Sequence, residues 1–238
     1  MGCAPRTSAA WAVGHGAWSR QDQRKMVPLA TATDIPRSHG GKRIALPALH
    51  FPMGASLPEV MRARRSVRAF GEGAISLGAV GQLLWAAQGV SGATGYRTVP
   101  SAGALYPLEA YLVAGEVRDL DVGVYRYVGA QHRLSLIQDG DRRPALAAAA
   151  LEQSWIADAR IVIALAGLYQ RSAAKYGQRA VRYVHMESGH AAQNVCLMAT
   201  FLGLGTTVVG AFRDQEVQAI VGLPSTEHLL CLLPVGPI

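Results

Sequence analysis

The chain has 238 residues, half of them hydrophobic and 16% charged, which is typical of one folded domain with a buried core, alone or with an arm. No stretch approaches the ~18 apolar residues of a membrane-spanning helix, and the N-terminal region lacks the apolar segment of a secretory signal, so we expect a cytoplasmic protein with no membrane partner. The net charge of +7 suits an anionic ligand, whereas nucleic acid is disfavoured because no basic run is interleaved with aromatic residues.

Residues 1–50 are predicted to form a flexible or extended N-terminal arm, followed by a folded domain over residues 51–238. Up to residue 42 the arm mixes Gly, Ser, Thr, Ala, Arg and Pro without periodicity. Several prolines keep the region up to Met53 extended: Pro28, Pro36, Pro47 and Pro52. The stretch from Ile44 to Leu49 would either add to a sheet edge or wrap around a partner.

A short helix is predicted from Ser56 to about Arg65, because a serine precedes a proline and an acid. It leads into a basic run that we call the arginine cluster: Arg62, Arg64, Arg65, Ser66 and Arg68. The planar guanidinium group matches phosphate in a bidentate way, and the serine adds a hydroxyl group. Because most charge runs are simply solvated faces, the cluster alone is a candidate anion site and no more.

The middle of the chain alternates short helices and strands. A helix is predicted from Ser76 to near Gly89, and a second over 142–153. Strands are predicted over 108–115 and 159–166, and residues 122–128 and 133–137 read as a hairpin. The sequence PSAGALYP (100–107) places small residues between two prolines, which predicts a rigid backbone that a ligand can approach closely.

The longest predicted helix lies within residues 175–212. Residues of one face recur at three- and four-residue steps: Val184, Ser188, Ala191, Val195, Met198 and Leu202. The other faces carry little charge, so the helix is buried in a core or against a second subunit. Gly203 and Gly205 are predicted to end it, and Thr206 to Val209 to form a buried strand. Lys175 and Tyr176 are placed in a polar loop just before it.

The elements mix without regular βαβ repeats, so the fold class is α+β. A helix from Asp214 to Gly222 and a strand from His228 to Val235 complete the chain. GLGTTVVG resembles a dinucleotide-binding motif, but it follows a helix and precedes a strand, which is the reverse of the order that the motif requires. His185, Glu187 and His190 resemble metal ligands, yet their spacing puts the two histidines on different helix faces, and we predict no metal site.

Five motifs occur together in a characteristic order: RRSVRAF at 64–70, LLWAAQG at 83–89, PSAGALYPLEAYLV at 100–113, KYG at 175–177, and RYVHMESGHAAQN with GLGTTVVGAF up to residue 212. In this order they resemble the FMN-dependent nitroreductase superfamily, in particular its SagB-type branch of azoline dehydrogenases. The resemblance covers about residues 57–236.

The resemblance implies a nitroreductase-like fold, with a mixed, mainly antiparallel sheet flanked by helices, and a homodimer formed through the long helices with shared FMN sites. It assigns three groups of FMN-binding residues. Arg64, Arg65 and Ser66 would hold the phosphate, and Arg68 would face the flavin pyrimidine edge. Pro100, Ser101, Ala102 and Gly103 would line the ring from the partner subunit, and Val209, Gly210 and Ala211 would approach N5 with backbone amides.

Lys175 and Tyr176 match the pair that serves proton transfer in the azoline-oxidising branch. The implied function is dehydrogenation of an azoline or related bond in a peptide-derived or natural-product substrate, beside a possible biosynthetic partner enzyme. Two alternatives stay open: an NAD(P)H-dependent reductase of nitro, quinone or enone compounds, and a non-catalytic flavin-binding partner in a biosynthetic complex. The chain departs from the family in ending on LPVGPI, without the basic residues that often help to hold the phosphate.

Overall fold

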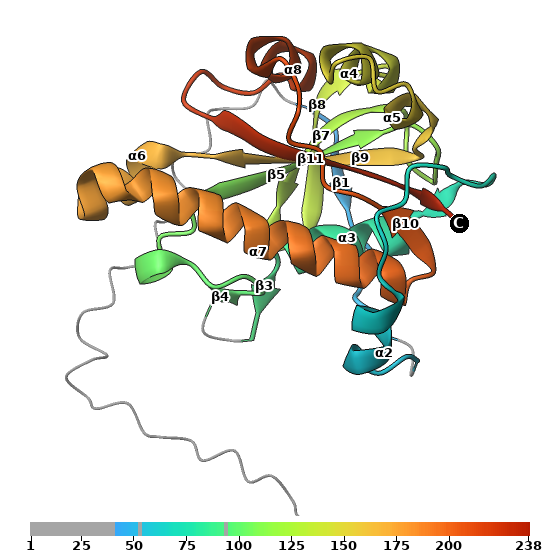
Figure 1. Ribbon diagram of the computed structural model, residues 1–238, viewed down its shortest axis with the longest axis horizontal. Coiled ribbons are helices and arrows are strands. Elements are labelled where there is room, and N and C mark those ends of the chain that lie inside the picture. Colours follow the sequence, from blue (N-terminus) through green and yellow to red (C-terminus); the bar gives the residue numbers. More distant parts are fainter. Residues whose placement is uncertain (1–40, 52–53, 93–94) are drawn as a thin grey trace, which may run out of the picture. The chain divides into compact units, whose positions relative to one another are not determined.

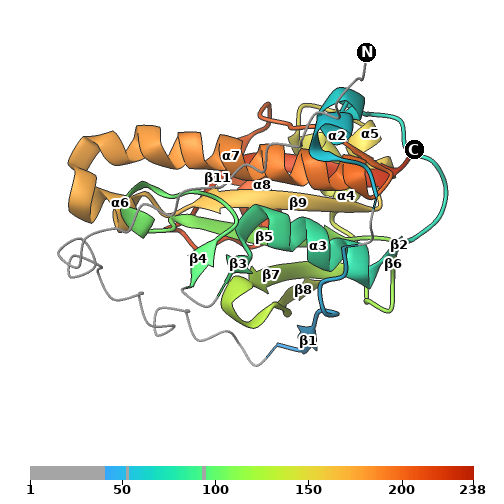
Figure 2. The same ribbon diagram turned by 90° about the horizontal axis from the view of Figure 1, so that it is seen from below.

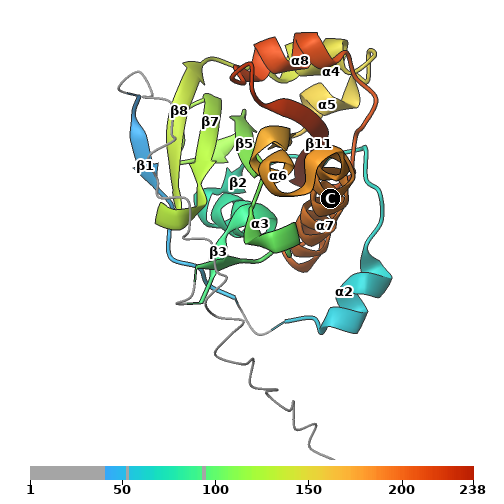
Figure 3. The ribbon, with the colours of Figure 1, turned by 90° about the vertical axis from the view of Figure 1, so that its left-hand side faces the viewer.

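The computed structural model describes residues 41–51, 54–92 and 95–238; most of the predicted arm lies outside these residues. The described chain is built around a seven-stranded sheet (Figure 1) with the strand order β1-β8-β7-β5-β9-β11-β10. Every neighbouring pair in this sheet is antiparallel. Helices lie on both of its faces, as Figure 3 shows. The predicted α+β class, with a mainly antiparallel sheet flanked by helices, is confirmed.

The seven strands are β1 (Arg43–Ala45), β5 (Leu108–Ala114), β7 (Gly123–Val128), β8 (Arg133–Asp139), β9 (Ile161–Gly167), β10 (Leu204–Thr206) and β11 (His228–Pro237). The α-helices are α2 (Leu57–Ala63), α3 (Leu77–Gln88), α4 (Arg143–Ala149), α5 (Trp155–Asp158), α6 (Tyr169–Tyr176), α7 (Ala180–Phe201) and α8 (Asp214–Val221). Two small ribbons pair β2 (Ile75–Ser76) with β6 (Val117–Arg118) and β3 (Val90–Ser91) with β4 (Tyr96–Arg97).

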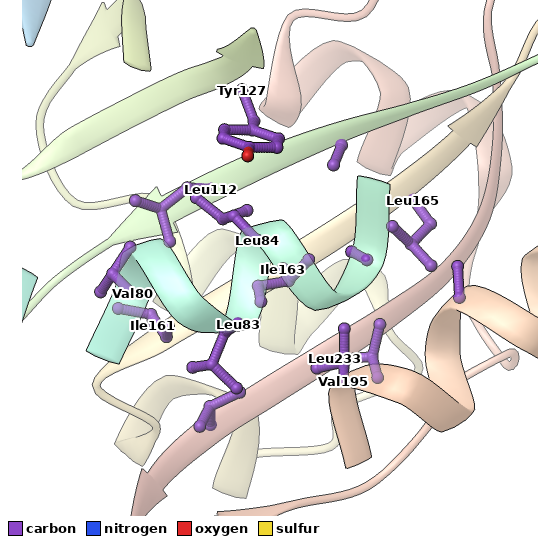
Figure 4. Packing of buried hydrophobic residues seen from close by; sticks show 14 of the residues in the cluster. Val80, Leu83, Leu84, Leu112, Tyr127, Ile161, Ile163, Leu165, Val195 and Leu233 are labelled. Carbon is purple, nitrogen blue, oxygen red and sulfur yellow. The ribbon is translucent and has the colours of Figure 1, made fainter. Parts of the chain in front are cut away.

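The central strands are apolar on both faces and separate two cores. Successive side chains of a strand point to opposite faces, so Leu112, Ile163 and Leu233 join the core under α3 and α7, which Figure 4 shows. Their sequence neighbours, including Val113 and Val162, face α4, α5 and α8 instead. Burial on both faces explains why these strands read as continuous apolar runs.

Helix α7 crosses the sheet beside α3 (Figure 2), and the predicted apolar stripe is its buried side. Val184, Ala191 and Val195 are fully buried. Gly203, at φ +70, follows its last turn, as predicted, whereas Gly205, also predicted to end the helix, lies in strand β10. The opposite face is open in the single chain, where the side chains of Val181 and Met186 are 51% and 55% exposed. The helix was predicted to be buried in a core or against a second subunit, and a second subunit would pack on this exposed face.

Three local predictions were wrong. The strand expected at 206–209 is β10 at Leu204–Thr206, because only these residues pair with the end of β11. The helix expected over 142–153 ends at Ala149, where the Ala149 carbonyl accepts from the Arg213 N–H group (2.9 Å) and Leu151 and Glu152 then turn the chain at positive φ. Lys175 and Tyr176 end helix α6 rather than lying in a loop.

Strand β1 settles one open alternative. Arg43–Ala45 pairs antiparallel with β8, and the N–H group of Leu46 donates to the carbonyl of His132 (3.1 Å). Leu46 is buried in the core. Of the two possibilities for Ile44 to Leu49, the structure therefore shows the sheet edge.

Candidate functional site

The arginine cluster follows α2 and lies along the edge strand β10. Ser66 forms a parallel bridge with Thr206, and the N–H group of Val67 donates to the Thr206 carbonyl (3.0 Å). Ser66, Arg65 and Arg68 are exposed at this edge. Two segments far apart in the sequence, the RRSVRAF and GLGTTVVGAF motifs, are thus brought side by side.

The four arginines of the cluster differ in their surroundings. Arg65 donates from Nη1 to the carbonyls of Arg62 (2.7 Å) and Arg64 (2.8 Å), which caps the C-terminal end of α2. The Arg68 guanidinium lies 5.7 Å from the ring centre of Trp155. Within the described residues none of the four has a carboxylate in salt-bridge range. The cluster is therefore a concentration of uncompensated positive charge, which suits a phosphate group.

The segment after β10 offers open backbone next to this charge. Val209 pairs with Leu232 through two hydrogen bonds of 2.8 and 2.9 Å. Gly210 and Ala211 are exposed, and among the described residues their N–H groups donate to no backbone carbonyl. A side chain added at Gly210 would meet nothing within 4 Å. The free amides and open space fit a flat, hydrogen-bonding ring system such as a flavin.

A second group of predicted residues surrounds a strained turn at 101–106. Gly103, Ala104 and Tyr106 all have positive φ (64°, 53° and 48°), and each such non-glycine residue costs on the order of 1–3 kcal/mol. Three side-chain contacts offset this strain: the Oγ atom of Ser101 accepts from the Tyr106 N–H (2.9 Å), Arg171 donates to the Tyr106 carbonyl, and the Arg97 guanidinium lies 5.1 Å from the Tyr106 ring centre.

Lys175 and Tyr176 lie directly over this turn. A Cβ atom at Gly103 would be 2.6 Å from the Tyr176 hydroxyl and 2.9 Å from the Lys175 Nζ atom. The Tyr176 ring packs edge-on against Tyr183, with ring centres 5.0 Å apart. Lys175 itself is exposed. The structure therefore brings together the last turn of α6 and the predicted 100–103 segment, which are far apart in the sequence.

The contact over Gly103 gives a testable prediction. Gly103→Ala would push the Lys175 amine and the Tyr176 hydroxyl away from the turn, and a displacement of about 1 Å can lower turnover by up to ~10²-fold. Gly140→Ala is the matched control, because Gly140 also has positive φ (90°) but has nothing within 4 Å of its Cβ position. Both variants should lose similar stability in thermal unfolding, whereas steady-state turnover should fall only in Gly103→Ala. Equal turnover of the two variants would show that the contact has no role.

Helix α7 carries a buried acid whose state the sequence did not reveal. Glu187 on α7 is 3% exposed, and its Oε1 atom has no hydrogen-bond partner within the described residues. Burial raises the pKa of Glu187 to about 7, against the opposing effects of the Ser101 hydroxyl and the positive charges of Arg97 and Arg171. The sequence signal that could have identified Glu187 as a candidate functional residue is that it is the only acidic residue in the long apolar helix α7.

The two groups lie towards opposite ends of α7 in one chain. The last turn of α6 lies over Gly103, whereas α2 leads into the arginine cluster. In Figure 1, α6 and α2 accordingly lie at the two ends of α7. The single chain thus brings each predicted group together but does not join the two groups.

The three residues once considered as metal ligands are dispersed. The His185 ring bonds to the Tyr169 hydroxyl (2.6 Å), Glu187 points into the interior, and His190 is exposed. No cluster able to hold a metal ion occurs within the described ranges. In the same residues, no helix is both long and apolar enough to cross a membrane.

The chain is similar to known proteins over most of its length. The nitroreductase family model matches residues 61–237. A provisionally named nitroreductase of Methanocaldococcus jannaschii is 47% identical over 180 residues, which are 76% of this chain and 90% of that protein. A trifolitoxin-processing protein of Rhizobium leguminosarum is 30% identical over 132 residues, 53% of this chain and 35% of its own length.

Solved structures share the fold. A provisionally named nitroreductase of Ralstonia eutropha superimposes with a TM-score of 0.72 at 23% identity, covering 84% of this chain and 91% of its own. A chain of the Escherichia coli microcin synthetase complex superimposes with a TM-score of 0.64 at 20% identity, and the match covers 91% of this chain and 85% of that chain. At these identities the two structures support the fold alone.

Proposed function

Because the chain belongs to the nitroreductase family of flavin-dependent oxidoreductases, we propose that it is an FMN-dependent dehydrogenase of the SagB-type branch. Its substrate would be an azoline, or a related bond in a peptide-derived or natural-product molecule. The observation that carries the proposal is the placement of the Lys175 amine and the Tyr176 hydroxyl together over Gly103.

FMN, when bound, supplies the acceptor for the hydride that leaves the substrate. Arg64 and Arg68 offer the charge, and Ser66 the hydroxyl, to hold its phosphate and pyrimidine ends. Arg65 contributes from a position already fixed by its bonds to the α2 carbonyls. The backbone of Val209, Gly210 and Ala211 would approach the ring, opposite a wall made by Pro100, Ser101, Ala102 and Gly103.

Removal of a proton from carbon is the task of the α6 pair. Lys175 would accept the proton, and Tyr176 would orient the amine or relay the proton outward. Tyr176 is held by its packing against Tyr183, so its hydroxyl has a fixed position over the turn. Holding both groups still relative to the ring lowers the barrier without any change in their own chemistry.

The separation along α7 supports a shared site in a homodimer. The cofactor would contact both the arginine cluster and the 100–103 segment, which one chain places towards opposite ends of α7. Two chains that pack their open α7 faces together would bring the cluster of one beside the turn of the other. The exposed face is a shallow groove lined by Gln178, Arg179, Val181, Arg182, His185 and Met186.

We expect the wild-type protein to be a dimer in light scattering at micromolar concentration, and Met186→Glu to be a monomer with less bound flavin. Met186 is 55% exposed in the single chain, so a charge there leaves the chain's own core intact. Val122→Glu is the control, since Val122 is an exposed apolar residue (40%) that directly precedes β7 and lies outside α7. A monomeric wild-type protein that retains flavin would contradict the shared site.

One relative favours the biosynthetic branch over a simple reductase. The R. leguminosarum protein, which is 30% identical over 132 residues, is named for processing trifolitoxin. A biosynthetic partner enzyme for this chain is therefore part of the proposal.

The second candidate is an NAD(P)H-dependent reductase of nitro, quinone or enone compounds on the same site. The exposure of Lys175 favours it, because hydride delivery from a nicotinamide needs no buried base. The third candidate, a non-catalytic flavin-binding partner, would keep the arginine cluster and need neither Lys175 nor Tyr176.

Flavin bleaching in a stopped-flow instrument separates the candidates. Under anaerobic conditions a thiazoline-containing peptide should reduce the bound flavin faster than NADH or NADPH does. Fast reduction by NAD(P)H followed by turnover of a nitroarene, with no response to the peptide, would establish the reductase instead. If neither the peptide nor NAD(P)H reduces the flavin, the non-catalytic candidate is preferred.

A further inference from the structure

Arg171 lies on α6, four residues before Lys175, and its guanidinium group joins the helix to two other parts of the chain. Its Nη1 atom donates to the carbonyl of Tyr106, the last residue of the strained turn at 101–106. Its Nη2 atom donates to Glu109 on β5 (3.0 Å). Residues four apart share one face of a helix, which fits the placement of both Arg171 and Lys175 against the turn.

The carboxylate that holds Arg171 is itself fixed by a buried charge network. The second oxygen of Glu109 lies 3.2 Å from Nη2 of Arg126 on β7, which in turn lies 3.3 Å from Glu227. The Tyr111 hydroxyl donates to the other oxygen of Glu227 (2.7 Å). The side chains of Glu109 and Arg126 are each 13% exposed, and that of Glu227 is 2% exposed. Because the acids and the arginines alternate, each buried charge has an opposite neighbour, and the network holds the guanidinium of Arg171 in one place.

The N-terminal end of α6 is tied to the same region through its backbone. The N–H group of Leu168, which precedes the helix, donates to the carbonyl of Pro107 (2.8 Å), directly after the turn. Lys175 and Tyr176 lie at the other end of α6. Arg171 lies between the two ends and joins the middle of the helix to the turn.

We propose that Arg171 is a positioning residue, which clamps α6 onto the strained turn and so sets the distance between the turn and the α6 pair, Lys175 and Tyr176. The consequence for catalysis rests on the proposed function, whereas the clamp itself is a property of the fold. Positive φ within the turn makes this conformation costly to hold, so the turn should open more often without the guanidinium. A base displaced by about 1 Å can lower turnover by up to ~10²-fold.

Hydrogen exchange tests the clamp without any substrate. Two amides of the turn donate within it, Ala104 to the Ser101 carbonyl (3.0 Å) and Tyr106 to the Ser101 hydroxyl (2.9 Å), so their exchange reports opening of the turn. In the flavin-loaded protein, Arg171→Gln should exchange both amides about tenfold faster than wild type. Arg171→Lys should fall between the two, because an ammonium group keeps the charge but lacks the planar fork that reaches both acceptors.

Glu227→Gln is the matched control for loss of stability. It removes a charge from the same network and leaves both contacts of Arg171 in place. Its unfolding temperature should fall, as that of Arg171→Gln should, but its Ala104 and Tyr106 amides should exchange at the wild-type rate. Arg118→Gln, which replaces an exposed arginine on β6, controls for the loss of one positive charge and should match wild type in both measurements.

A double-mutant cycle tests whether Arg171 acts through the turn. The measured step is single-turnover flavin bleaching by the thiazoline peptide, which Arg171→Gln should slow about tenfold, while flavin content and any reduction by NAD(P)H stay near wild-type values. Gly103→Ala and Arg171→Gln both alter the spacing over the turn, so together they should slow the step no more than about twofold beyond the slower single variant. Effects that multiply would mean that Arg171 acts elsewhere and would overturn the positioning role.

The outcomes distinguish this inference from the proposed function. Unchanged exchange of the turn in Arg171→Gln would overturn the clamp, whatever the substrate. Equally fast exchange in Glu227→Gln and Arg171→Gln would show a general loosening of the fold and would overturn it as well. Faster exchange in Arg171→Gln alone, in a protein that never oxidises a thiazoline peptide, would support the clamp while the proposed dehydrogenase activity fails.

Discussion

Lys175→Ala is expected to slow oxidation of a thiazoline peptide by ~10²–10⁴, the usual worth of one general base. Azoline dehydrogenation removes a proton from carbon, and water at neutral pH is a poor base for that step. The oxidation rate of Tyr176→Phe should fall by a similar factor if the hydroxyl orients the amine. The phenyl ring keeps the packing on Tyr183, so this variant removes the hydroxyl alone. The measurement is single-turnover flavin bleaching by the peptide.

The same variants should keep their flavin and their reactivity towards NAD(P)H. Both residues end α6, at the opposite end of α7 from the arginine cluster, and nicotinamide oxidation needs no base. Lys42→Ala, which removes an exposed lysine bound to Asp121 at the far edge of the sheet, is the matched control. If both α6 variants oxidise the peptide at the wild-type rate, the pair has no catalytic role and the reductase candidate is preferred.

Replacement of Arg64 and Arg68 together by alanine should release FMN. Each charge-assisted hydrogen bond contributes ~1.5–3 kcal/mol, so loss of two should weaken binding by on the order of 10²–10⁴. Fluorescence titration of the apoprotein with FMN, at fixed ionic strength, measures the effect.

The control for this prediction removes the same charge elsewhere. Arg43→Ala with Arg118→Ala deletes two exposed arginines outside the cluster and should leave FMN affinity within about twofold once salt screens long-range effects. A colourless wild-type protein that does not bind added FMN would refute the cofactor assignment. Equal loss in both double variants would mean that net charge, rather than the cluster, holds the cofactor.

The sequence alone determined the features that depend on near neighbours along the chain. The apolar stripe of α7, with Val184, Ala191 and Val195 buried, follows from a local period. The capping of α2 also follows from a local pattern, because the Glu59 carboxylate accepts from the N–H group (2.7 Å) and the hydroxyl (2.8 Å) of Ser56, three residues earlier. The five motifs in order were sufficient to predict the family and the fold class.

Only the tertiary structure decided which of these pieces meet. Gly103 and Lys175 are brought together because α6 follows β9, which pairs with β5 directly after the 101–106 turn. Arg171 donates to the Tyr106 carbonyl and to Glu109 (3.0 Å), both more than sixty residues away in the sequence. No local period encodes such contacts, because they depend on the order of strands in the sheet. The sequence therefore determined the elements and the family, whereas strand order and helix packing decided the neighbours of each chemical group.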